Sequence, residues 1–310
     1  MTSQLAHWPH VTDTVLDVGG RPVRVLRTPG RGTGSPQLLV HGLGGSSVTW
    51  VQIMAGLAEH GPVVAVDLPG FGRTPIGDGD PLTVRGYADF VLAAADALGW
   101  DRFTLHGNSM GGLIGTLLAA EHPDRLDRLV LVSPALPPRS PLGFLLPSAV
   151  TLGGIVPLVT SSVAALALGV VGLAGPELNA RRNRTMLQLI FPDPDAIEPE
   201  VLDLMAADFA DDVEGVDRRR ALLAATLSIA LLWARPRGSW NAVRDLRTPT
   251  LLLGGTHDAL VPARVLRAVG AARTDWESHL LDDRRHALML EDPASYLEIF
   301  DRWTAVEHAA

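Results

Sequence analysis

The sequence has 310 residues, of which 47% are hydrophobic and 19% charged, with 31 Gly, 23 Pro and no Cys. This length suits one large domain, or one domain with a sizeable insertion, and the composition excludes a disordered or fibrous chain. The formal net charge is −8 and all 26 basic residues are scattered arginines, which argues against nucleic acid as a partner. The absence of cysteine excludes disulfides, thiolate metal sites and a cysteine nucleophile.

Both ends of the chain alternate short β-rich runs with stretches of helical spacing. Strands are predicted at residues 14–18, 22–28, 37–41, 62–67, 103–107, 128–132, 250–254 and 277–281. Helices are predicted at residues 50–60, 83–98, 111–122, 263–272 and 294–306. Strands that alternate with helices of this length predict an α/β fold, with a mostly parallel eight-stranded sheet and helices on both of its faces.

Residues 134–246 break this alternation. The segment is rich in Pro and Gly at first, and then predicts helices at 198–209 and 217–233. We therefore expect a core formed by residues 1–133 and 247–310, with a helical insertion after the sixth strand.

The run Gly107-Asn108-Ser109-Met110-Gly111 follows a predicted strand and opens a predicted helix. A serine on such a sharp turn needs small residues two positions away on either side, because bulk there would push strand and helix apart. The turn exposes the serine hydroxyl at a helix N-terminus, where backbone N–H groups favour negative charge. This context favours Ser109 as a nucleophile over an ordinary tight turn.

A nucleophilic serine creates an oxyanion, which needs two preorganised donors. The N–H of Met110, directly after the serine, can supply one of them. The glycine-rich loop His41-Gly42-Leu43-Gly44-Gly45 follows the third predicted strand, and the N–H of Leu43 can supply the other. We expect His41 itself to be a structural hydrogen-bonding residue rather than a base.

Ser109 also needs a base, and the base needs an acid that orients it. Of the ten histidines, His286 lies in a loop just after the last predicted strand, at the sheet edge expected to carry Ser109. Asp258 follows the seventh predicted strand at the same edge. The chain order Ser, Asp, His is the one that this type of sheet requires. Asp67, Asp282 and Asp283 remain weaker alternatives for the acid.

Five motifs together resemble the α/β-hydrolase superfamily and cover nearly the whole chain outside the insertion. They are HGLGG at 41–45, DLPGFGRT at 67–74, GNSMGG at 107–112, GGTHDALVP at 254–262 and RHALMLEDP at 285–293. The resemblance implies an α/β-hydrolase sheet in which residues 134–246 form the cap, or lid, and it implies neither a metal nor an organic cofactor.

By the same resemblance Ser109 is the nucleophile, Asp258 the acid and His286 the base, with the N–H groups of Leu43 and Met110 as the oxyanion hole. One position departs from the family, which often has glycine directly before the catalytic histidine, whereas this chain has Arg285. The departure bears on the geometry of that loop and not on the choice of His286.

The nucleophile narrows the reaction that the resemblance implies. Haloalkane dehalogenases and epoxide hydrolases of this superfamily use Asp at the elbow, so Ser109 argues against both. GNSMGG also resembles the meta-cleavage-product hydrolases, which break C–C bonds, but those enzymes commonly carry Trp after the catalytic histidine and this chain has Ala287. The sequence thus favours a serine esterase or lipase-like hydrolase of a small apolar ester or related carbonyl substrate. A non-catalytic binding member of the fold is a further alternative.

The run Leu158–Gly175 is apolar or small and, at 18 residues, barely reaches the length of a membrane span. A single span there would separate Ser109 from Asp258 and His286, so an assembled triad excludes it. Core packing of the cap, the wall of an acyl pocket and a weak contact with a lipid surface remain as its roles. Since the N-terminus shows no secretory pattern, we expect a cytoplasmic protein. The substrate and the oligomeric state stay open.

Overall fold

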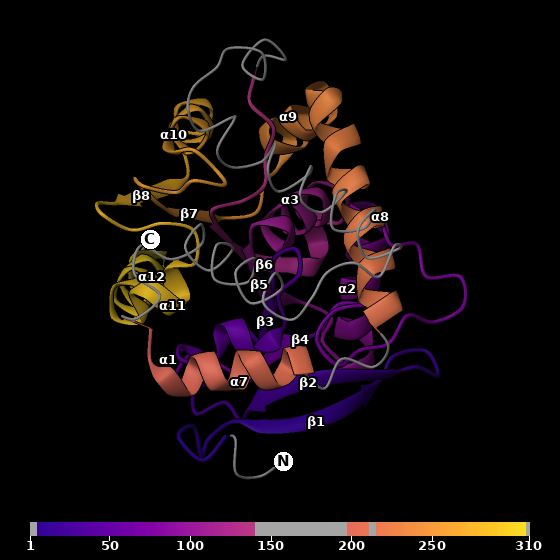
Figure 1. Cartoon of the computed structure of the whole chain (residues 1–310). Helices are drawn as coiled ribbons and strands as arrows, with labels where there is room; N and C mark the ends of the chain where they lie inside the picture. Colours follow the sequence, from indigo (N-terminus) through magenta and orange to yellow (C-terminus); the bar gives the residue numbers. More distant parts are fainter. Residues whose placement is uncertain (1–4, 140–196, 211–214, 308–310) are drawn as a thin grey trace.

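The computed structural model describes residues 5–139, 197–210 and 215–307, and these contain one eight-stranded sheet (Figure 1). The strand order is β1-β2-β4-β3-β5-β6-β7-β8. The strands are β1 Thr12–Asp17, β2 Pro22–Thr28, β3 Gln37–Val40, β4 Val63–Val66, β5 Phe103–Asn108, β6 Leu126–Val132, β7 Thr250–Gly255 and β8 Glu277–Leu281. β2 runs antiparallel to β1 and β4, and every pair from β4 to β8 is parallel. The predicted mostly parallel sheet is confirmed.

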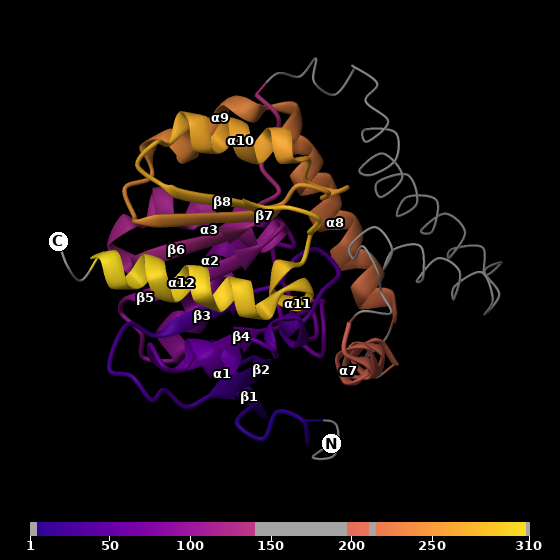
Figure 2. The ribbon, with the colours of Figure 1, turned by 90° about the vertical axis from the view of Figure 1, so that its left-hand side faces the viewer.

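Helices cover both faces of this sheet. The helices of the described residues are η1 Ser47–Trp50, α1 Met54–Leu57, α2 Val84–Ala97, α3 Met110–Glu121, η2 Pro123–Arg125, α7 Pro199–Ala210, α8 Gly215–Ala234, α9 Pro236–Asp245, α10 Ala263–Ala272, α11 Leu288–Glu291 and α12 Pro293–Glu307. The side chains of each strand alternate between the faces, so that Leu38 and Val40 of β3 join the core under α2 and α3, while Leu39 joins the core under α1 and α12. Figure 2 views the molecule from the side of α12, which crosses in front of the strands.

The predicted helix at residues 50–60 is wrong in extent. A 3-10 turn at Ser47–Trp50 and one helical turn at Met54–Leu57 replace it. All four residues of η1 are buried, so packing rather than an amphipathic face determines the local conformation. Gly56 lies so close to α12 that a Cβ there would come within 2.5 Å of the Leu297 side chain.

Of the described residues between β6 and β7, three stretches are helical. α7 and α8 match the helices predicted at residues 198–209 and 217–233, whereas α9 was not predicted. Pro236 at its start and Gly238 weaken the sequence signal, although Trp240 and Val243 form a buried face. The apolar run Leu158–Gly175 lies outside the described residues. Of the helices that the structure describes, none has the length and hydrophobicity needed to cross a membrane.

Candidate active site

Ser109 occupies a strained turn between β5 and α3. Its φ of 54° and ψ of −113° lie where residues other than glycine are rarely found, and such a conformation costs on the order of 1–3 kcal/mol. The surroundings hold the turn in place, because the Ser109 N–H donates to Val132 O at 2.9 Å and the Ala135 N–H donates to Ser109 O at 2.9 Å. Hydrogen bonds with β6 and with the segment directly after β6 therefore hold the backbone of Ser109.

The glycines around the elbow are required by close backbone approach. A Cβ on Gly107 would lie 2.4 Å from the carbonyl oxygen of Gly111, and a Cβ on Gly111 would lie 2.2 Å from that of Val40. No real Cβ atom tolerates such distances. The small residues that the sequence places two positions before and after Ser109 therefore allow β5, α3 and β3 to meet.

His286 and Asp258 form a buried pair at the carboxyl ends of β7 and β8. The distance from His286 Nδ1 to Asp258 Oδ2 is 2.8 Å, and each residue is 5% exposed. The other carboxylate oxygen accepts the N–H groups of Leu260 and Val261, both at 2.8 Å. With both oxygens occupied, the Asp258 carboxylate is held fixed, and its contact assigns the proton of the imidazole to Nδ1. Nε2 is then the atom that can accept a proton.

Hydrogen bonds to two side chains, Glu291 and Asn108, hold the loop that carries His286. The Glu291 carboxylate accepts the N–H of Arg285 at 2.8 Å and that of Ala287 at 2.9 Å. The Asn108 side chain, next to Ser109, donates to His286 O at 3.1 Å and to Val132 O at 3.2 Å. Burial raises the pKa of Glu291, while the two N–H donors oppose that rise.

Sequence reasoning missed Asn108 and Glu291, because each acts on the backbone of a loop that only the fold brings near. It also left the effect of Arg285 open. Among the described residues other than glycine, positive φ values occur at Ser109, Ser133 and Asp283. Arg285 therefore occupies a conformation that needs no glycine, and the loop accommodates it.

The glycine-rich loop after β3 lies directly against the elbow. A Cβ on Gly42 would be 3.0 Å from Ser109 Cβ, and the Gly45 N–H donates to Gly42 O at 3.1 Å to close a turn. Met110 is the first residue of α3, so its N–H has no acceptor one turn earlier in the helix. The N–H groups of Leu43 and Met110 thus belong to two segments that meet at Ser109.

His41 fills a structural role. Its Nε2 accepts the Leu68 N–H at 3.1 Å, which leaves Nδ1 to donate to Gly42 O at 2.7 Å. Burial lowers the pKa of the His41 ring, so it stays neutral. Both ring nitrogens are occupied, as expected for a hydrogen-bonding residue of the loop.

The weaker acid alternatives have other partners. Asp67 accepts the backbone N–H of Ser47 at 2.6 Å and that of Arg73 at 2.9 Å. Asp283 lies on the surface, and its Oδ1 is 3.3 Å from His257 Nδ1. Within the described part of the chain, no group of three or more His, Asp or Glu side chains is arranged to hold a metal ion.

The fold agrees with the comparison to known proteins. Residues 37–165 match the family model of the alpha/beta hydrolase fold. These residues are less than half of the chain, and together with the eight-stranded sheet they indicate an α/β-hydrolase fold. Among solved structures, a candidate lipase from Acinetobacter baumannii AYE superposes with a TM-score of 0.77 at 19% identity, over 100% of this chain and 96% of that one. At that identity the likeness concerns the fold alone.

Proteins similar in sequence to this chain include two hydrolases. The 2-hydroxy-6-oxo-2,4-heptadienoate hydrolase of Pseudomonas putida strain F1 is 24% identical over 287 residues, which are 89% of this chain and 91% of that protein. RutD, a candidate carbamate hydrolase of Caulobacter sp. strain K31, is 42% identical over 96 residues. That match spans 31% of this chain and 36% of RutD.

Proposed function

We propose that this α/β-hydrolase is a serine hydrolase that cleaves carboxylic esters of apolar substrates. The observation that carries the proposal is the buried His286–Asp258 pair, with 2.8 Å between Nδ1 and Oδ2, at the edge of the sheet where the strained Ser109 turn ends β5. An orienting carboxylate, a neutral imidazole and an exposed hydroxyl on parallel strand ends are the parts that nucleophilic acyl transfer needs.

In this mechanism His286 Nε2 takes the Ser109 proton as Oγ attacks the ester carbonyl carbon. The carbonyl oxygen becomes an oxyanion that accepts hydrogen bonds from the N–H groups of Leu43 and Met110. Asp258 stabilises the imidazolium, which then protonates the departing alcohol and leaves an acyl-enzyme. Water, deprotonated by His286, attacks the acyl carbon and releases the carboxylic acid and Ser109.

The apolar preference follows from the residues beside the oxyanion loop. Leu43 packs against the core, and the Leu222 side chain of α8 would lie 3.4 Å from a Cβ at Gly44. Each methylene of an acyl chain that rests on apolar surface contributes about 0.8 kcal/mol, a factor of roughly four in kcat/KM. The rate should therefore rise over the first acyl carbons and level off where the apolar surface ends.

A C–C bond hydrolase is the second candidate, favoured by the similarity to the heptadienoate hydrolase and by the GNSMGG elbow. That reaction would use the same Ser109, His286 and Asp258. Ala287 follows His286 where such enzymes commonly carry tryptophan, and this difference places the ester reaction first.

Labelling with a fluorophosphonate probe tests the serine chemistry, since only an activated serine reacts. The wild type should label and Ser109→Ala should not. A panel of p-nitrophenyl esters from acetate to long acyl chains, run beside a vinylogous dienone, then separates the two reactions. Rates that rise with acyl length support the ester proposal, whereas turnover of the dienone alone would overturn it.

A further inference from the structure

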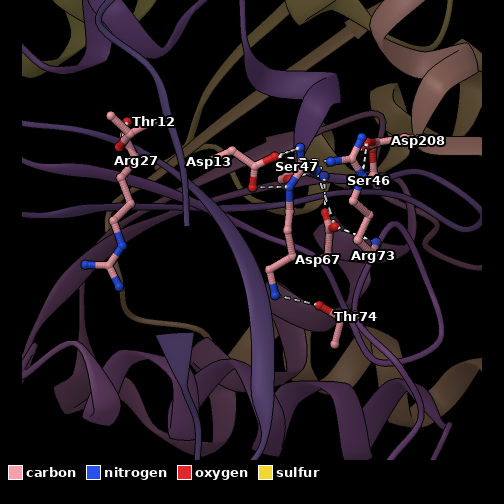
Figure 3. A network of polar contacts seen from close by, with 10 residues as sticks. Thr12, Asp13, Arg27, Ser46, Ser47, Asp67, Arg73, Thr74 and Asp208 are labelled. Carbon is pink, nitrogen blue, oxygen red and sulfur yellow. Dashed lines mark hydrogen bonds and ion pairs between the residues drawn. The ribbon is translucent and has the colours of Figure 1, made fainter. Parts of the chain in front are cut away.

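A second cluster of buried charges lies beside the oxyanion loop (Figure 3). Its centre is Arg24 of β2, which is 4% exposed. Arg24 Nε and Nη2 contact the two oxygens of Asp13 at 2.9 and 3.0 Å, and Nη1 contacts Asp67 at 3.3 Å and Asp208 at 3.0 Å. Asp13 lies on β1, Arg24 on β2 and Asp67 directly after β4. Asp208, in contrast, lies on α7.

Asp208 belongs to the segment between β6 and β7. The contacts that the structure describes for its carboxylate are all with residues outside that segment. Its Oδ2 accepts the Ser46 hydroxyl at 2.7 Å as well as Arg24 Nη1, and its Oδ1 lies 3.1 Å from Arg73 Nε. The carboxylate is 2% exposed. It therefore fixes the end of α7 against the core with three contacts.

The same cluster holds the residues that directly follow the oxyanion loop. Ser46 comes after Gly45 and donates to Asp208. Ser47 receives Arg24 Nη1 on its hydroxyl at 2.8 Å and donates its N–H to Asp67 at 2.6 Å. The end of the loop that carries the Leu43 N–H is thus anchored partly by a helix of the insertion.

We propose that Asp208 is a positioning residue that couples the placement of α7 to the geometry of the oxyanion loop. The inference rests on the proposed serine-hydrolase function. The Ser46 hydroxyl donates to Asp208 Oδ2, and Ser46 directly follows the loop of residues 41–45, whose Leu43 N–H is the proposed oxyanion donor. A displacement of about 1 Å in such a donor can cost about a hundredfold in rate.

Stability alone is a weak reason for this arrangement. Burial raises the pKa of the Asp208 carboxyl and Asp67 adds to the rise, while Arg24, Ser46 and Arg73 oppose it. A charge cluster of this kind repays the cost of its desolvation only in part, and apolar residues of similar volume often stabilise a fold as well. What the cluster adds is a defined position for the loop, because each carboxylate accepts directional bonds.

The test compares Asp208→Asn with two control variants on α7. Asparagine keeps the shape of the side chain but removes the charge. Its NH2 group replaces one carboxylate oxygen and cannot accept, so either Arg73 or the pair Ser46 and Arg24 loses its acceptor. Asp203→Asn makes the same chemical change on the exposed side of α7. Leu204→Ala removes buried apolar contacts of α7 but keeps the three polar contacts that hold Asp208, so it controls for a general loss of stability. Thermal unfolding of each variant is measured first, and the labelling assays are run at a temperature at which all variants are folded.

The measured quantities are the second-order rate constant of fluorophosphonate labelling of Ser109, and kcat and KM for a short ester. For Asp208→Asn we expect labelling to slow about 10-fold or more, with kcat falling more than KM rises, because the oxyanion hole acts in the transition state. Asp203→Asn and Leu204→Ala should label like the wild type. Ser46→Ala should slow labelling as well, and the double variant should be no slower than Asp208→Asn, since both remove one link.

Labelling of Asp208→Asn at the wild-type rate would overturn the coupling, as would a change in KM alone or an equal loss in Leu204→Ala. If Asp208→Asn does not fold, Ser46→Ala decides, because a wild-type rate in that variant also refutes the link. A wild type that does not label at all refutes the serine-hydrolase proposal itself, and this inference with it, so the two failures are distinguishable.

Discussion

The two buried clusters use similar groups under different constraints. Asp258 faces a single imidazole and fills its second oxygen with the N–H groups of Leu260 and Val261. Asp67 and Asp208 share Arg24 and bind hydroxyl and N–H groups of segments that are distant in sequence. In the proposed function the first cluster leaves His286 Nε2 as the atom that takes the proton, whereas the contacts of the second cluster join loops. What else each carboxylate touches, rather than its burial, therefore separates a reactive site from an anchoring one.

The largest expected effect removes the reacting groups. Ser109→Ala should lower kcat by roughly 10⁴–10⁶-fold, and His286→Ala should cost about as much because the two groups act as one unit. The double variant should be little worse than either single variant. Steady-state kinetics on a p-nitrophenyl ester measure this, and additive losses would show that His286 is not the partner of Ser109.

Exchanging acid for amide in each cluster tests the comparison directly. Asp258→Asn should lower kcat by about 10⁴-fold, because the imidazole loses the charge that fixes its tautomer. Asp67→Asn should lower kcat far less and should lower the melting temperature more, since Asp67 joins Arg24, Ser47 and Arg73. If Asp67→Asn abolishes activity in a folded protein while Asp258→Asn does not, the two roles are reversed.

The support of the catalytic loop should give an intermediate effect. In Glu291→Gln one oxygen can still accept an N–H, but the amide nitrogen faces the other N–H, so Arg285 or Ala287 loses its acceptor. We expect kcat to fall about 10-fold with little change in KM, because the position of His286 and not substrate binding is disturbed. Glu298→Gln, on the exposed side of α12, is the matched control. Equal kcat in the two variants would remove Glu291 from the support of His286.

His106 provides the smallest and most specific contrast, a buried histidine on β5 that is bonded to Tyr296 and Gln37 at 2.7 Å each. Burial lowers the pKa of His106 from 6.5 to about 3. Between these values the unfolded chain binds a proton that the folded protein does not. His106 therefore contributes a loss of stability as the pH falls from 6.5 toward 3, with a slope of up to about 1.4 kcal/mol per pH unit.

His106→Gln isolates this contribution. The free energy of unfolding of the variant, measured in urea between pH 4 and pH 7, should lie below that of the wild type at pH 7, and the difference should shrink as the pH falls. A difference that stays constant with pH would mean that His106 binds its proton equally well in the folded and the unfolded protein, so that burial does not lower its pKa.

Much of the fold could be predicted from the sequence because its signals are local. β2, α10 and β8 have the predicted bounds, and the other strands differ only at their ends. Most of the strands are short apolar runs between turn residues. The helix predicted at residues 50–60 was wrong in extent because the buried 3-10 turn at Ser47–Trp50 occupies its start, and only Met54–Leu57 form a helical turn. The sequence did not predict α11, because a helix of four residues is too short to show a periodic pattern.

The residues of the candidate site divide in the same way. Ser109, Asp258, His286, Leu43 and Met110 stand in or beside turn motifs that the chain order makes visible, and that order predicts a common edge of the sheet. The sequence alone thus determined the elbow, the parallel strands and the candidates for nucleophile, base and acid. Only the tertiary structure decided that Asp258 rather than Asp67 contacts His286. It alone also brought Glu291, Asn108 and Asp208 to backbone and side-chain groups of loops that no local pattern joins, because hydrogen bonds between segments far apart in the chain depend on packing.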